Sequence, residues 1–71
     1  MKVVNSQAIH EADRKYVKVE IYADSTPNPM PTTADIPGYD ESYYFFPGST
    51  LYVVGTGDLY MTGETNNWVK Q

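Results

Sequence analysis

Residues 15–22 read Lys-Tyr-Val-Lys-Val-Glu-Ile-Tyr, and their side chains alternate with a period of two. One set is aliphatic and consists of Val17, Val19 and Ile21, whereas the other set consists of Tyr16, Lys18, Glu20 and Tyr22. Successive side chains of a β-strand point to opposite faces, so the pattern predicts a half-buried strand. Because the second set mixes tyrosines with charges, we expect its face to lie under another segment or at an interface.

Two further runs of β-forming residues occur at 49–54 and 58–62. They are separated by Gly55-Thr56-Gly57, and two glycines in three residues suit the positive φ angles of a tight turn. Gly and Asn residues at 63–67 predict a second reversal, after which 68–70 returns as a short strand. The C-terminal third is therefore predicted to form a three-stranded meander.

Residues 23–48 contain all five prolines of the chain. Prolines at this spacing exclude a continuous helix or a central strand. The segment is also rich in apolar and aromatic side chains, so we predict an ordered loop rather than a solvated coil. Within this loop we favour a strand at 42–46 that ends at Pro47-Gly48.

The N-terminal stretch has a weaker pattern. Residues 6–14 contain too few apolar side chains for a sustained helical face, and Asn5 or Ser6 would suit a helix cap. We expect one or two helical turns or a loop there. Taken together, the segments predict a single domain over residues 1–71 of the all-β or mainly β class, with a small antiparallel sheet, a C-terminal meander and a Pro-rich ordered loop.

The length of the chain limits its hydrophobic core. Domains of 71 residues are marginal, and many gain stability from disulfides, a metal ion or association. The absence of cysteine excludes disulfides, and a single histidine, His10, leaves zinc without its usual ligands. Self-association or docking onto a larger assembly is then the favoured source of stability, with a small monomer as the alternative.

The charge balance excludes some classes of partner. Five basic and nine acidic residues give a formal net charge of −4, and the isoelectric point is about 4.6. The basic residues form no run longer than a pair, so we expect no nucleic-acid partner. No apolar stretch has the length of a signal peptide or a transmembrane segment, so we expect no membrane partner.

Groups that could carry catalysis or bind a metal are sparse. Asp35, Asp40 and Glu41 lie near the tyrosine-rich segment, but a glycosidase needs a cleft between two acids, and solvated loop acids or turn caps are the simpler interpretation. Asp24 lies on the same loop, without the spacing of a calcium-binding EF-hand. His10 stands beside two acids without a nucleophile. We predict no enzyme, no catalytic or metal site and no cofactor.

Aromatic side chains are the best candidates for function, because a tyrosine combines an apolar ring with a polar tip, as in protein interfaces and sugar-stacking surfaces. The candidate interface residues are Tyr39, Tyr43, Tyr44, Tyr52 and Tyr60. Tyr52 and Tyr60 alternate with four aliphatic residues, Leu51, Val53, Leu59 and Met61. If these four face the core, both tyrosines lie on the opposite face. A place in the core is favoured for Phe45, Phe46 and Trp68.

The C-terminal two thirds contain four short motifs. They are Pro31-Thr32-Thr33-Ala34-Asp35-Ile36-Pro37-Gly38, Pro47-Gly48-Ser49-Thr50-Leu51-Tyr52-Val53-Val54, Gly57-Asp58-Leu59-Tyr60-Met61 and Asn67-Trp68-Val69. With this order of loop, hairpin and final tryptophan strand, residues 24–70 resemble small proteins encoded among the virion structural genes of tailed phages and prophages of Gram-positive bacteria. The resemblance implies a capsid-associated or other virion accessory role without catalysis.

The expected function is therefore that of a phage or prophage structural accessory protein. It would bind other copies of itself or a larger protein lattice, and it would be found in the virion or in the host cytoplasm during assembly. The alternative is a small carbohydrate-binding module that stacks a glycan on Tyr and Trp rings.

Overall fold

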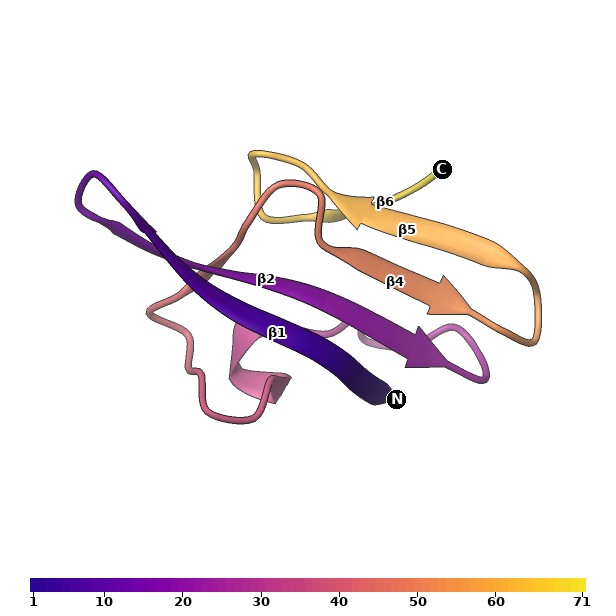
Figure 1. The fold of residues 1–71 in the computed structure, drawn as a ribbon. Coiled ribbons are helices and arrows are strands. Elements are labelled where there is room, and N and C mark those ends of the chain that lie inside the picture. The colour runs from indigo at the N-terminus through magenta and orange to yellow at the C-terminus, as the bar shows by residue number, and fades with distance from the viewer.

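A single six-stranded sheet organises the chain (Figure 1). The computed structural model describes all 71 residues. The strands are β1 (Lys2–Glu11), β2 (Arg14–Ala23), β3 (Tyr44–Phe45), β4 (Thr50–Val53), β5 (Asp58–Thr62) and β6 (Trp68–Lys70), and η1 (Thr33–Asp35) is a short 3-10 helix. The strands lie in the order β1-β2-β4-β5-β6, and β3 also pairs with β2. The predicted mainly β class and the C-terminal meander are confirmed.

The sheet is mixed rather than wholly antiparallel. β2 runs parallel to β3 and β4, whereas the pairs β1–β2, β4–β5 and β5–β6 are antiparallel. Parallel neighbours require a crossover of a dozen or more residues, and the Pro-rich segment between β2 and β3 supplies it. The predicted antiparallel pairing is thus correct for the strand pairs toward both edges of the sheet. At the centre, where β2 meets β3 and β4, the pairing is parallel instead.

The N-terminal segment corrects a prediction. Residues 6–14, expected to form helical turns or a loop, belong to a hairpin in which β1 pairs with β2 along its whole length. The two strands are joined by Ala12 and Asp13, and Ala12 has a φ angle of 53°, as in the first position of a type II′ turn. Most β1 side chains are exposed, so the sequence of β1 has no apolar periodicity. Backbone pairing with β2 holds the strand in the sheet.

The strand predicted at 42–46 is present but shorter, since β3 covers only Tyr44–Phe45. β3 and β4 pair with the same edge of β2 and are separated by a bend at Phe46–Ser49. The Ser49 hydroxyl bridges this gap, because it accepts a hydrogen bond from the Val19 N–H at 3.1 Å and donates one to the Phe46 carbonyl at 2.9 Å. Ser49 is fully buried there.

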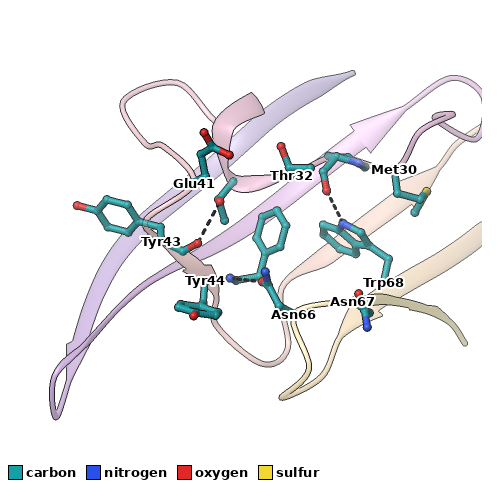
Figure 2. A pocket seen from close by; sticks show the side chains of 11 residues that line it. Met30, Thr32, Glu41, Tyr43, Tyr44, Asn66, Asn67 and Trp68 are labelled. Carbon is teal, nitrogen blue, oxygen red and sulfur yellow. Dashed lines mark hydrogen bonds between the residues drawn. The ribbon is translucent and has the colours of Figure 1, made fainter.

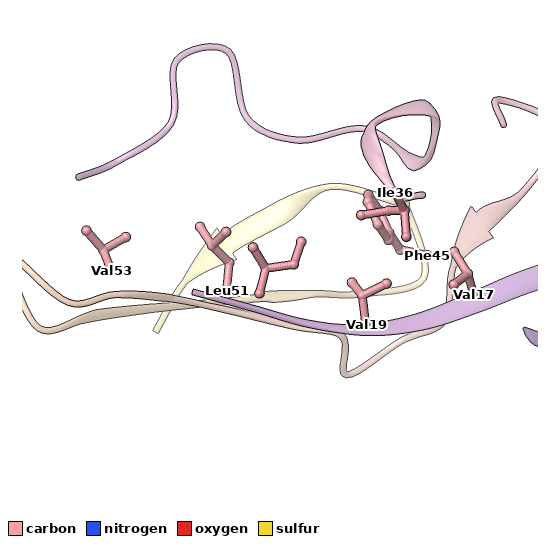
Figure 3. Close-up of a cluster of buried hydrophobic side chains, with 7 residues drawn as sticks. Val17, Val19, Ile36, Phe45, Leu51 and Val53 are labelled. Atoms are coloured by element: carbon pink, nitrogen blue, oxygen red, sulfur yellow. The ribbon is translucent and has the colours of Figure 1, made fainter. Parts of the chain in front are cut away.

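The Pro-rich loop covers one face of the sheet. Figure 3 shows the resulting core, which consists of Val17, Val19, Ile21, Phe45, Leu51 and Val53 from the strands and Ile36 from the loop. Ile36 follows η1 and is 1% exposed. The Trp68 indole N–H donates to the Pro31 carbonyl at 2.9 Å and ties the loop to β6. The prediction of an ordered loop is therefore confirmed. We call this the covered face.

Candidate functional site

The opposite side of the sheet, which we call the open face, has no segment packed over it. Residues that pair across neighbouring strands point to the same side, so Tyr22 on β2, Tyr52 on β4 and Leu59 on β5 form one row. Their exposed fractions are 45%, 37% and 37%. The Tyr22 and Tyr52 rings meet edge to face with centroids 5.9 Å apart. We call this the Tyr22 row. Two further apolar side chains of the open face, Met61 on β5 and Val69 on β6, lie one row away, in register with Thr50 and Glu20.

A second row lies near the start of β2. Ile9 pairs with Tyr16, and Tyr16 pairs with Tyr44 on β3, so all three share the open face. The Tyr16 ring lies 6.3 Å from the Tyr44 ring and 5.4 Å from the Phe46 ring, centroid to centroid. The Arg14 guanidinium lies 4.4 Å from the centroid of Tyr44, in a cation–π contact. We call this the Tyr16 row.

A polar belt separates the two rows. Its β2 residues are Lys18 and Glu20, which pair with Gln7 and Asn5 on β1. The Asn5 amide donates to the Glu20 carboxylate at 3.4 Å, a long hydrogen bond. The only ion pair in the chain joins Lys70 to Asp58, so Lys18 has no carboxylate within salt-bridge distance. The open face thus presents apolar side chains at both ends of β2 and charges in the middle.

The five predicted interface tyrosines divide between the two faces. Tyr44 and Tyr52 lie on the open face. Tyr39 and Tyr43 lie on the loop side, pack against the core and meet edge to face with centroids 4.9 Å apart. Tyr60 also packs against the core. The structure therefore brings the five together as two groups rather than one surface.

The placement of Tyr60 corrects the expectation that it shares a face with Tyr52. The four-residue turn Val54–Gly57 pairs Tyr52 with Leu59 and pairs Tyr60 with Leu51. Tyr60 therefore points to the covered face. Leu59 points to the open face, and Met61 does so as well. Side chains alternate between the faces within each strand, as predicted. The turn, however, places the even-numbered residues of β4 and the odd-numbered residues of β5 on the same face.

The structure adds open-face residues that were not among the predicted five. They are Tyr16, Tyr22, Leu59, Met61 and Val69. The alternation of residues 15–22 already placed Tyr16 and Tyr22 together on the face opposite the core. The register between strands was the missing information, because it decides which rows these tyrosines join.

The loop side carries a shallow hollow of about 660 Å³ (Figure 2). It is lined by aromatic rings, amides and one acid, including Tyr43, Trp68, Asn66, Asn67 and Glu41. The Asn66 side-chain oxygen accepts a hydrogen bond from the Phe45 N–H at 2.7 Å, which fixes one wall of the hollow. The opposite end of the Asn66 amide and the Glu41 carboxylate make no hydrogen bond within the chain.

The acids of the loop act as turn caps. The Asp35 carboxylate accepts the Thr32 N–H at 2.8 Å at the start of η1. The Asp40 carboxylate accepts hydrogen bonds from the hydroxyl and the N–H of Ser42, and these lower the pKa of Asp40 below its usual value. No three His, Cys, Asp or Glu side chains are grouped so that they could hold a metal ion. No helix has the length and apolar character to cross a bilayer.

Comparison with protein-family models, curated proteins and solved structures finds no match to this chain. The open face and the hollow are therefore interpreted from their geometry and chemistry.

Proposed function

We propose that this chain is a structural accessory protein of a phage or prophage particle, and that it binds protein through the open face of its sheet. The resemblance of residues 24–70 to small virion proteins supports the setting. The observation that carries the binding role is the open face itself, where Tyr22, Tyr52 and Leu59 stay between 37% and 45% exposed in one row.

The size of the open face suits a protein partner. The chain measures 37 × 22 × 19 Å, so a face with its two longer dimensions covers roughly 800 Å², which is the area that each partner contributes to a standard protein interface. Apolar side chains gathered on an exposed face mark interaction sites on soluble proteins. Tyrosine is also among the residue types that carry most binding energy. The face thus has the area and the chemistry of a protein interface.

A triple variant tests this role. Tyr22→Ser, Tyr52→Ser and Leu59→Ser together remove the Tyr22 row, while Glu41→Ser changes an exposed side chain on the loop side and serves as control. In sedimentation velocity and in pull-downs with purified virion proteins, we expect the wild type and the control to associate and the triple variant to fail. A wild-type chain that stays monomeric and binds no virion protein would contradict the proposal, as would association that survives the triple change.

The second candidate function is glycan binding, and the hollow on the loop side favours it. Sugar sites combine aromatic rings for stacking with amides and carboxylates for hydrogen bonds, and Trp68, Asn67 and Glu41 supply such groups around a volume typical of ligand pockets. On a glycan array, this function predicts hits that Glu41→Gln or Asn67→Ala weakens and that Tyr52→Ala leaves intact. An array without hits leaves protein binding as the sole candidate.

A further inference from the structure

The outward side chains of β2 follow an order that is complementary to its own reverse. After Arg14, which begins the strand, they are Tyr16, Lys18, Glu20 and Tyr22. Reversal of the strand about Val19 exchanges one tyrosine for the other and replaces the cation by the anion. A surface that must contact its own copy about a two-fold axis needs this property, because each group then meets its complement twice.

We propose that the open face binds a second copy of this chain, face to face, about a two-fold axis that lies between the sheets at right angles to β2 and level with Val19. The inference deepens the proposed function, since it rests on the open face being a protein-binding surface, and it names the partner. Lys18 then lies opposite Glu20 of the second copy, and Tyr16 lies opposite Tyr22 of the second copy.

The neighbouring strand follows the same symmetry. β3 and β4 pair with the same edge of β2, with Tyr44 beside Tyr16 and Tyr52 beside Tyr22. The same axis therefore places Tyr52 over Tyr44 of the second copy. The Tyr22 and Tyr52 rings of each chain then lie over the Tyr16 and Tyr44 rings of the other, so aromatic side chains meet at both ends of β2. Two stacked sheets lie about 10 Å apart, a gap that tyrosine rings from both sides can fill.

The charges in the belt are free to pair between chains. Lys18 has no ion pair within its own chain, and Glu20 accepts only the long hydrogen bond from Asn5. Two reciprocal Lys–Glu contacts would form in the middle of the interface. Such contacts fix orientation and partner choice more than they add affinity. The apolar rows supply the affinity, and the total area of roughly 1,600 Å² is that of a standard interface.

Charge exchange tests the two-fold pairing. Lys18→Glu alone and Glu20→Lys alone each place like charges opposite one another at two positions, so each variant should dimerise at least about tenfold more weakly than the wild type. An equimolar mixture of the two variants restores opposite charges at both positions. We expect the mixture, followed by sedimentation velocity or native mass spectrometry, to form a one-to-one heterodimer with an affinity close to that of the wild type. Circular dichroism checks that both variants are folded.

A double variant provides a second measurement. Lys18→Glu and Glu20→Lys in one chain keep the belt self-complementary and should restore the homodimer. Dimerisation that is indifferent to all these changes, as an edge-to-edge dimer through β1 would show, overturns the two-fold pairing, and so does a mixture that stays monomeric. A monomeric wild type that still captures a virion protein through the Tyr22 row overturns only this inference and leaves the proposed function standing.

Discussion

The same alternation of side chains produces both faces of β2, but one face is buried and the other is exposed. Val17, Val19 and Ile21 are at most 1% exposed beneath the Pro-rich loop, whereas Tyr22 on the other face is 45% exposed. The difference comes from the crossover, because residues 24–43 pass over only one side on their way to β3. A half-buried strand pattern therefore identifies two chemically distinct faces, and the long connection decides which one becomes the core.

The covered face also has the stronger polar attachments. Trp68 donates to Pro31 and attaches the middle of the loop to β6, and the Thr33 hydroxyl donates to the Tyr43 carbonyl at 3.0 Å near the end of the loop. No buried side-chain polar atom lacks a hydrogen-bond partner. By contrast, the contacts among the side chains of the open face are ring contacts, one cation–π contact and one long hydrogen bond. Stability should thus depend on the covered face and association on the open face.

The largest effect on the free energy of unfolding should come from weakening the packing of the Pro-rich loop against the covered face. Ile36→Ala removes the loop side chain that reaches the core, and truncation of a buried isoleucine to alanine costs about 2–5 kcal/mol. Val69→Ala on the open face, where Val69 is 55% exposed, should cost less than about 0.5 kcal/mol. Urea unfolding at a concentration that keeps the chain monomeric measures both. Equal costs for the two variants would remove the distinction between the faces.

The second prediction concerns the place where the loop leaves β2. A Cβ atom on Gly55 would overlap the carbonyl oxygen of Asp24, and the Gly55 N–H donates to the same oxygen at 3.0 Å. Gly55→Ala should therefore destabilise the chain by about 1–3 kcal/mol, since the turn and the loop must move apart. Gly63→Ala is the control, because its Cβ meets nothing within 4 Å. Thermal unfolding should show a lower Tm for Gly55→Ala alone, and an unchanged Tm would mean that the junction is not tightly packed.

The third prediction probes the bend between β3 and β4, which both faces share. Ser49→Ala leaves the Val19 N–H without its acceptor in the buried sheet, at a cost of about 1–3 kcal/mol. Thr62→Val removes a hydroxyl that donates to the Phe46 carbonyl at 3.1 Å, but Ser49 still donates to that oxygen. Thr62→Val should therefore cost the smaller amount in denaturant unfolding. The reverse ranking would show that the Ser49 hydroxyl does not bridge the bend.

Local sequence patterns were enough for most of the strands. The alternation at 15–22, the glycines at 55 and 57 and the prolines of the loop each act through neighbouring residues, and they predicted β2, the meander and an ordered loop correctly. β1 was not predicted, because an edge strand with exposed side chains has no apolar period. The parallel pairing of β2 with β4 was not predicted either, since it depends on where the connection over residues 24–49 returns to the sheet.

The candidate site was predictable by residue type but not by arrangement. The sequence singled out tyrosine for its apolar ring and polar tip, and Tyr44 and Tyr52 are on the open face. The assignment of Tyr60 to the open face was wrong, because the length of the turn decides which residues of β5 point to which face. Placing Tyr22 beside Tyr52 requires the register of two strands 30 residues apart in sequence, which no local pattern contains.

The smallest expected effect lies in the loop, at Asp40. Hydrogen bonds from the Ser42 hydroxyl and then from its N–H lower the pKa of Asp40, and Lys15 adds a weaker electrostatic contribution. A carboxyl whose pKa is lower in the folded than in the unfolded chain adds stability above its unfolded pKa, and this stability is lost as the pH falls through the folded value. We therefore expect a slight loss of stability below about pH 4 that Asp40→Asn abolishes.

Ser42→Ala separates the two hydrogen bonds to Asp40, because it removes the hydroxyl and keeps the N–H. The pKa of Asp40, followed through its side-chain NMR resonances, should rise part of the way toward 3.8 in this variant. Since Asp40 is exposed on the loop, dimerisation through the open face should not change with this titration. Dimerisation that weakened along with the protonation of Asp40 would couple the two sides of the sheet and contradict their separate roles.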